Sequence, residues 1–337
     1  MTAAVLAIDG GGSKTDVALV AADGSMLASA RGGASNHQVV GPDAALAELV
    51  SLVREVAGKA GQAVDAPVAA HTSACLAGAD LPDEEAELTA RLAAQGWSAT
   101  VTVVNDTFAV LRAGLDDDLP GRHWGISVEC GQGTNCAGMA PDGRSFRFVA
   151  LGDISGDWGG GGDLGPDALW WAARAEDGRG PDTELRRAVP AHFGVSRVED
   201  VTLGVYRGTI GYAQLPGLTP VLLAVANNGD EVARAVVLRQ ADEVCAMAMV
   251  AARNLGLADG APDGAPVPVV LGGSVLTARD PLLTSAIMER IAKQLPGAEV
   301  RIIEAPPVLG AALLGLDHLG APPGAAARLR ECARATR

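Results

Sequence analysis

Two stretches of the chain repeat the same order of features, and this repeat constrains the fold more than any other part of the sequence. Residues 5–30 read VLAIDGGGSKTDVALVAADGSMLASA, and residues 124–150 read WGISVECGQGTNCAGMAPDGRSFRFVA. Each stretch has an apolar run, a glycine loop, a run of small residues, an Asp-Gly pair and a third run. The shared order indicates an internal duplication, with one glycine loop in each copy.

The segment after the first glycine loop excludes the two common nucleotide motifs. Asp23-Gly24 lies between strand-like runs at Val17–Ala22 and Met26–Ala30, and Asp-Gly in that position predicts a hairpin. In a Rossmann unit or a P-loop NTPase the glycine turn must open a helix, whereas here it opens a strand. A Walker A loop needs Gly directly before Lys, but Lys14 follows Ser13, and Thr15 occupies the third glycine position of G-x-G-x-x-G.

Composition narrows the class of protein and its partners. The chain has 337 residues, enough for two domains, and a formal charge of −14, so no diffuse positive field exists to attract nucleic acid or anionic lipid. The chain does not show the pattern of a signal peptide. It also has no apolar run of the roughly 18 residues needed to span a bilayer. We therefore expect a cytoplasmic protein with no nucleic-acid or membrane partner. Its five cysteines are scattered without a C-x-x-C pair, which predicts reduced, mostly buried thiols.

Hydrophobic periodicity predicts an α/β chain. The first domain is predicted to run β-β-β-α-β-α-β, with the later elements at residues 42–57, 67–72, 83–95 and 99–104. Downstream we expect a glycine-rich loop at Gly152–Gly165, and then a mostly helical stretch whose longest helix spans about 230–257. Further elements are predicted at 266–271 (strand), 281–294 (helix), 299–304 (strand) and 308–319 (helix), and the last eighteen residues either close a domain or fray.

The polar residues at one strand end and the two glycine loops match what phosphoryl transfer requires. Asn105 and Asp106 follow a predicted strand, at the place where ligand sites of open α/β sheets lie. Two glycine loops facing one cleft could hold a nucleotide's phosphates, and the reaction also needs a divalent metal and a carboxylate beside the attacking hydroxyl.

Simpler interpretations stay open for several of these residues. A glycine loop can be a tight turn, Asp106 can cap the helix that follows it, and Asp157 can brace its loop. His37 can make an ordinary structural hydrogen bond. The run Asp116-Asp117-Asp118 looks like a metal cluster but is better interpreted as a solvated turn.

Five segments, in their order along the chain, resemble the sugar kinase, heat-shock and actin superfamily: Asp9–Asp16, Asn105-Asp106, Gly131–Asn135, Leu271–Ser274 and Gly310–Gly315. Within it the chain is most similar to the N-acetylglucosamine kinases and the BadF/BadG/BcrA/BcrD ATPase family, and ASNHQVVG at 34–41 and GDISGDWG at 152–159 look specific to the amino-sugar kinases. The resemblance implies two actin-like (ribonuclease H-like) domains, each a mixed five-stranded sheet with helices, around a nucleotide and sugar cleft. It implies domains at 1–118 and 119–337, with the last helix packing back on the first domain, and a homodimer.

The resemblance also implies roles for individual residues. Asp106 is expected to be the catalytic base, and Asp9 to position Mg²⁺ through water. The expected ATP contacts are Gly10, Gly11, Gly12, Ser13, Lys14, Thr15, Gly131, Gln132, Gly133, Gly272, Gly273 and Ser274. The expected sugar contacts are Asn36, His37, Asn105, Thr134, Asn135, Gly152 and Asp157.

The function implied is an ATP-dependent kinase that phosphorylates the 6-hydroxyl of an amino sugar, N-acetylglucosamine first among the candidates. Gln132 and Trp158 depart from the residues common in such kinases, so glucosamine, N-acetylmuramic acid or another hexose stay open as substrates. An alternative is a BadF-type ATPase that activates an acyl-CoA dehydratase or reductase through an iron–sulfur cluster. A third hypothesis, a sugar-sensing regulator without turnover, is disfavoured because Asp106 is present and no helix-turn-helix region precedes the fold.

Overall fold

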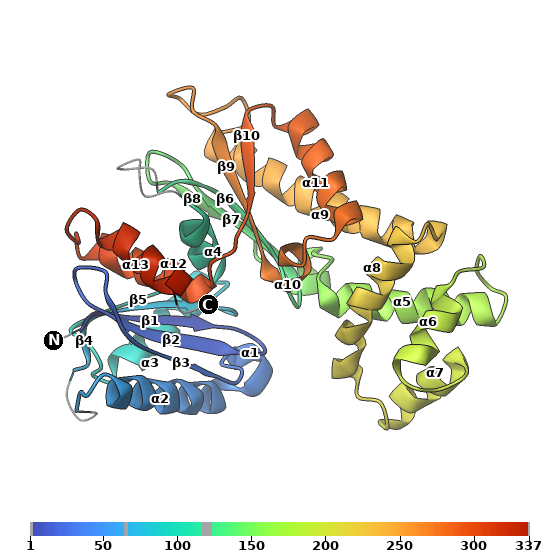
Figure 1. Cartoon of the computed structure of the whole chain (residues 1–337), viewed down its shortest axis with the longest axis horizontal. Coiled ribbons are helices and arrows are strands. Elements are labelled where there is room, and N and C mark those ends of the chain that lie inside the picture. Colours follow the sequence, from blue (N-terminus) through green and yellow to red (C-terminus); the bar gives the residue numbers. More distant parts are fainter. Residues whose placement is uncertain (1–2, 64–66, 116–122, 336–337) are drawn as a thin grey trace. The chain divides into compact units, whose positions relative to one another are not determined.

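The chain folds into two compact units built from non-contiguous segments. The computed structural model describes all residues except 1–2, 64–66, 116–122 and 336–337 (Figure 1). The first unit comprises residues 1–127, 137–149 and 303–337, and the second comprises 128–136 and 150–302. The predicted boundary at 118/119 and the Asp116-Asp117-Asp118 run lie outside the described residues, so both interpretations stay predictions.

The first sheet is five-stranded, with the order β3-β2-β1-β4-β5. Its strands are β1 (Ala3–Gly10), β2 (Thr15–Val20), β3 (Met26–Gly32), β4 (Ala69–Leu76) and β5 (Thr100–Asn105). β1, β2 and β3 pair antiparallel, as the two turns require, whereas β4 is parallel to both β1 and β5. The predicted hairpin turn is present, with Gly24 at φ 87°. The predicted element order of this region is confirmed, apart from a short helix, α1 (His37–Val40), that the periodicity does not show.

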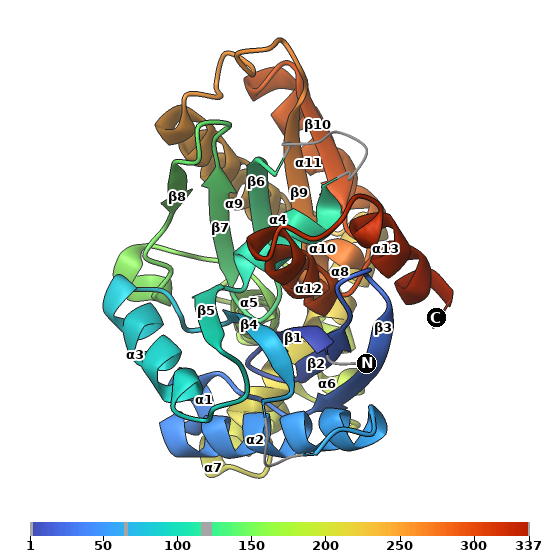
Figure 2. The ribbon, with the colours of Figure 1, turned by 90° about the vertical axis from the view of Figure 1, so that its left-hand side faces the viewer.

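Helices cover both faces of the first sheet. Alternating side chains of β1 point to opposite faces, so Leu6 and Ile8 pack with α2 (Pro42–Lys59) and α3 (Pro82–Ala93). Val5 and Ala7 pack on the other side with α4 (Thr107–Gly114), α12 (Pro307–His318) and α13 (Ala325–Ala335). Figure 2 shows α2 along one face of this sheet and α12 along the opposite face. The C-terminal residues therefore form a helix whose Leu329 is fully buried in this core.

The second sheet repeats the topology of the first. Its order is β10-β9-β6-β7-β8, and its strands are β6 (Gly125–Cys130), β7 (Thr134–Met139), β8 (Ser145–Arg147), β9 (Val267–Gly272) and β10 (Ala298–Ile302). In chain order, strands one to five of each copy take the same places across the sheet. β9 and β10 are parallel and β7 and β8 antiparallel, so both sheets are mixed. The α/β fold class with two mixed five-stranded sheets is confirmed.

The second unit holds a helical stretch between β8 and β9, as predicted. Its α-helices are α5 (Gly161–Glu176), α6 (Leu185–His192), α7 (Val198–Arg207), α8 (Thr219–Asn227) and α9 (Glu231–Leu255), followed after β9 by α10 (Gly273–Thr277) and α11 (Pro281–Gln294). Two 3₁₀ helices, η1 (Gly152–Ser155) and η2 (Tyr212–Leu218), complete it. The expectation of a loop through Gly165 is wrong, because α5 already begins at Gly161.

Candidate active site

The first glycine loop joins β1 to β2, and its Gly10 and Gly11 carbonyl oxygens are hydrogen-bonded within the protein. The Gly10 carbonyl accepts a hydrogen bond from Ala77 N at 2.7 Å, and the Gly11 carbonyl accepts one from Ser35 N at 3.0 Å. Carbonyl oxygens repel phosphate, so a loop that binds phosphate through its N–H groups must place them elsewhere. Gly12, Ser13 and Lys14 are exposed at the end of the loop, where the predicted phosphate contacts require them.

Thr15 has a structural role that the sequence did not reveal. Its side chain is fully buried, its hydroxyl donates to the Gly33 carbonyl at 2.7 Å, and it lies 2.7 Å from Ser35 Oγ. The side chain thus ties the start of β2 to the segment before α1. Contact between Thr15 and ATP stays a prediction, and the buried hydroxyl favours a supporting role.

An acidic edge forms where three parallel strands end. The sheet register places Gly10 beside Leu76, and Leu76 beside Asn105, so β1, β4 and β5 end in one row. Asp9, on β1, and Asp106, directly after β5, therefore both lie at this edge. Burial, with the Asp106 charge as the next cause, raises the pKa of Asp9 to about 8. Burial and the charge of Asp80 raise the pKa of Asp106 to about 7.

The side chain of Asp106 does not cap α4. The residue occupies the cap position, but its side chain makes no capping hydrogen bond. Asn105 takes that role instead, because its Oδ1 accepts from Thr107 N at 3.1 Å and from Thr107 Oγ1 at 2.6 Å. The cap of α4 is thus supplied by the Asn105 side chain, and the Asp106 carboxylate makes no capping hydrogen bond.

Asn105 also binds Asp80, a residue that sequence reasoning missed. Asn105 Nδ2 donates to Asp80 Oδ1 at 2.8 Å, and Asn105 is only 1% exposed. The amide thus joins the loop after β4 to the end of β5. Burial, followed by the charge of Glu84, raises the pKa of Asp80 to about 6. Sugar contact by Asn105 stays a prediction, and its burial favours a positioning role.

The segment before α2 brings three more polar residues to this loop. Asn36 caps α1, with its Oδ1 accepting from Gln38 N at 2.9 Å, and His37 Nε2 lies 3.9 Å from Glu84 Oε1. Gln38 Nε2 lies within hydrogen-bond distance of Asp80 Oδ2 at 3.3 Å and Glu84 Oε1 at 3.0 Å. Asn36 and His37 are partly exposed beside Asp80, as predicted sugar contacts would have to be.

The second glycine loop, in the second unit, has the same construction as the first. All three of its carbonyl oxygens accept hydrogen bonds: Gly131 from Gly161 N at 2.8 Å, Gln132 from Gly162 N at 2.7 Å, and Gly133 from Gly131 N at 2.9 Å. A Cβ at Gly160 would lie 2.6 Å from the Gln132 and Gly133 oxygens. The run Gly159–Gly162 is thus explained by close backbone packing against the loop, instead of by the extended loop that the sequence suggested.

The other predicted residues of the second unit surround this loop or follow it. Thr134 is 6% exposed and Asn135 Oδ1 accepts from Cys136 N at 2.7 Å. The Gly152 carbonyl accepts from Asp157 N at 3.1 Å, and Asp157 Oδ2 accepts from Ser155 Oγ at 2.5 Å. Asp157 therefore braces its loop, and sugar contact by any of these four residues stays a prediction.

The predicted adenosine loop lies against the end of β6. Gly272 ends β9, and Gly273 begins α10 with φ at 81°, in the left-handed region that favours glycine. A Cβ at Gly273 would overlap the backbone of Cys130, the residue directly before the second glycine loop. Gly272, Gly273 and Ser274 are thus adjacent to Gly131–Gly133 within one unit, as a nucleotide's base and phosphates require.

The donor set at Asp9 fits a magnesium ion. Mg²⁺ keeps several waters and is held by one or two carboxylates together with substrate phosphates. Burial and the charges of Asp106 and Asp16 raise the pKa of Asp9, whereas the charges of Lys14 and Arg31 lower it. A divalent cation would offset this accumulation of negative charge. Among the described residues, no group of three or more His, Cys, Asp or Glu side chains could hold a metal ion. A magnesium site that keeps several waters does not need such a group.

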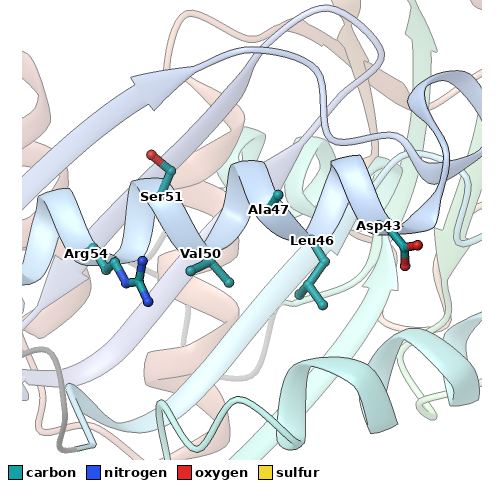
Figure 3. Close-up of a pocket in the computed structure, with 6 residues that line it drawn as sticks. All are labelled: Asp43, Leu46, Ala47, Val50, Ser51 and Arg54. Carbon is teal, nitrogen blue, oxygen red and sulfur yellow. The ribbon is translucent and has the colours of Figure 1, made fainter.

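A surface hollow of the first unit is separate from these residues. It measures about 510 Å³ and lies on the outer face of α2 (Figure 3). Its lining residues are Asp43, Leu46, Ala47, Val50, Ser51 and Arg54. None of them is a predicted site residue.

The duplicated mixed sheet, with a glycine loop after the first strand of each copy and acidic residues at the strand ends, defines the class of actin-like ATPases and sugar kinases. The family model for the BadF/BadG/BcrA/BcrD ATPase family matches residues 6–315, and the chain belongs to that family. This confirms the resemblance read from the motifs.

Two curated relatives and one solved structure are similar over most of the chain. N-acetyl-D-glucosamine kinase of Dictyostelium discoideum is 27% identical, covering 93% of this chain and 97% of the relative. N-acetylmuramic acid/N-acetylglucosamine kinase of Clostridium acetobutylicum is 30% identical over 71% of this chain and 76% of its own length. A structure from Chromobacterium violaceum has a TM-score of 0.71 at 24% identity and covers 93% of this chain and 99% of that one, which shows the fold.

Two further expectations from composition can be compared with the structure. Cys75, Cys130, Cys136 and Cys245 are buried free thiols and Cys332 is a partly buried one, as predicted. None of the helices in the described part of the chain combines the length and apolar character that a bilayer crossing requires.

Proposed function

We propose that this protein is an ATP-dependent kinase that transfers the γ-phosphoryl group of ATP to the 6-hydroxyl of an amino sugar, with N-acetylglucosamine as the expected substrate. The observation that carries the proposal is the acidic edge of the first sheet, where the charge of Asp106 acts on Asp9 beside a glycine loop whose Gly10 and Gly11 carbonyls are hydrogen-bonded within the protein. Both curated relatives are named as kinases of N-acetylated amino sugars, which supports the substrate class.

We propose a role for each group of site residues. The loops Gly10–Ser13 and Gly131–Gly133 would hold the phosphates. Their donors would be N–H groups such as those of Gly12, Ser13 and Gln132, because Gly11 N and Gly131 N already donate to carbonyls at 3.0 and 2.9 Å. Gly272–Ser274 would contact the adenosine. Asp9 would hold Mg²⁺ through water, and the ion would supply neutralisation of the phosphate charge. Asp106, whose pKa of about 7 lies near the operating pH, would accept the proton of the sugar hydroxyl.

Asn36 and His37, beside Asp80, would recognise the sugar, with Thr134, Asn135, Gly152 and Asp157 as further contacts. Asn105 would position Asp80 and α4. We also propose that the protein acts in the cytoplasm as a homodimer. The name of the Clostridium relative keeps N-acetylmuramic acid as a second candidate substrate. The BadF-type activator is less well supported, because its iron–sulfur cluster needs accessible cysteines and four of the five here are buried.

A coupled ADP-release assay tests the proposal. It compares N-acetylglucosamine, glucosamine, N-acetylmuramic acid, N-acetylmannosamine and glucose at a fixed MgATP concentration, with sugar-free enzyme as the background. We expect N-acetylglucosamine to give the highest kcat/KM and Asp106→Asn to remove the sugar-dependent rate. Equal, background-level ADP release with every sugar would contradict the proposal.

A further inference from the structure

A buried amide on the longest helix contacts the second glycine loop. Gln240 lies on α9 and is 0% exposed, among apolar neighbours such as Val237, Ala241 and Val244. Burying an amide is costly unless its groups are hydrogen-bonded, so a glutamine here needs partners.

Both ends of the Gln240 amide have partners. Its Oε1 accepts from Gly160 N at 2.8 Å, and its Nε2 donates to Thr134 Oγ1 at 3.4 Å. The position before Gly160 must also be glycine, because a Cβ at Gly159 would lie 2.5 Å from Gln240 Oε1 and 2.6 Å from Thr134 Oγ1.

These two partners lie on either side of the loop that would take the phosphates. Gly160 directly precedes Gly161 and Gly162, whose N–H groups hold the carbonyls of Gly131 and Gln132. Thr134 directly follows the loop, and its hydroxyl lies 3.4 Å from Cys130 Sγ at the loop's other end. Gln240 therefore contacts both the support of the loop and its exit strand.

We propose that Gln240 is a positioning residue for nucleotide binding, which fixes the second glycine loop through Gly160 and Thr134. The inference deepens the proposed function and rests on it, because it requires that this loop binds nucleotide phosphates. Gln240 itself does not touch the nucleotide. The adjacent Arg239 lies over the Trp158 ring, 3.8 Å from its centroid, so α9 contacts the predicted sugar segment and the phosphate loop through consecutive residues.

The test compares Gln240→Met with Val244→Ala. Methionine keeps the length and approximate volume of glutamine but removes both hydrogen bonds. Val244→Ala makes a cavity in the same helix without touching the loop, and it serves as the control for lost stability. Calorimetric titration with MgATP and with MgADP, in the absence of sugar, gives the affinity of each folded variant.

We expect Gln240→Met to weaken nucleotide binding at least tenfold, and Val244→Ala to stay within twofold of the wild type. In steady state, KM for MgATP should rise more than KM for the sugar. Equal nucleotide affinities in Gln240→Met and Val244→Ala would overturn the inference.

Hydrogen exchange on the wild type provides a second measurement if Gln240→Met does not fold. Nucleotide should slow exchange at residues 131–135 and at 159–162 together, and protection of the first segment alone would overturn the inference. Because binding and exchange need no sugar, these results stand apart from the kinase assay. If nucleotide binds as expected but no sugar is phosphorylated, the proposed function fails and the role of Gln240 does not.

Discussion

The strongest test of the acidic edge is the effect of pH on the stability of Asp9→Asn. In the folded protein the pKa of Asp9 is about 8, against an ordinary value of 3.8. Between these values the folded state holds a proton that the unfolded state has lost, so stability decreases as pH rises through this window. The contribution of this proton to the free energy of unfolding is fully present below pH 3.8 and is lost as pH rises through 8. Asparagine cannot lose a proton, so the variant should avoid this loss.

The magnitude follows from the size of the shift. Each pKa unit corresponds to about 1.4 kcal/mol, and pH 7 lies roughly three units above the ordinary value, which gives an upper limit of about 4 kcal/mol. Asp9 is partly exposed, so we expect about half to all of this value. Since 1 kcal/mol shifts the Tm of a domain of 150–250 residues by about 2–4 °C, the variant should melt several degrees higher at pH 7.

Calorimetric unfolding from pH 5 to pH 8 in EDTA measures the effect. The stability advantage of Asp9→Asn over the wild type should grow steadily across this range. Asp43→Asn, at an exposed surface carboxylate, is the control and should follow the wild type. Parallel curves for Asp9→Asn and the wild type would refute the reasoning. Adding MgATP in place of EDTA should stabilise the wild type more than the variant, because the ion needs the Asp9 carboxylate.

Three further predictions follow from the same contacts. Asp106→Asn should lower kcat by about 10² to 10⁴-fold in the ADP-release assay with KM values little changed, and a loss below tenfold would argue against a base role. Asp80→Asn removes a charge that raises the pKa of Asp106, so the acidic limb of the kcat/KM profile should move to lower pH; a shift to higher pH would be inconsistent with this reasoning. Gly310→Ala should destabilise the first unit by about 1–3 kcal/mol in urea unfolding, because its Cβ would overlap the Ala109 carbonyl, whereas Gly58→Ala, with open space around it, should stabilise by about 0.5–1 kcal/mol.

The strands, the hairpins and most helices could be predicted because their signals are local. Asp23-Gly24 determines a turn by itself, and the apolar spacing of α2 determines its buried face. The predicted range of α11, 281–294, agrees with the structure at both ends. The duplication could also be predicted, because residues 5–30 and 124–150 show the same order of features.

The parts that could not be predicted depend on contacts between distant segments. Asp80 follows β4 in an Ala-rich stretch, and only the register of three strands shows that it reaches Asn105. Gln240 looks like one polar residue on an amphipathic helix, yet it contacts a loop more than a hundred positions earlier in the chain. The role of the glycine run Gly159–Gly162 at the start of α5 could not be predicted for a similar reason, because it depends on the close approach of Gly160 to the carbonyls of Gln132 and Gly133.

The acidic edge is itself an argument for function over stability. Asp9, Asp80 and Asp106 come from separate segments, and each has a raised pKa because burial disfavours its charged form. Near neutral pH this arrangement lowers the stability of the folded state. A tight turn or a helix cap would need none of these charges, and Asn105 already supplies the cap of α4. A cation together with a substrate hydroxyl would relieve the repulsion at Asp9 and Asp106, which is how a kinase active site differs from a structural loop of the same shape.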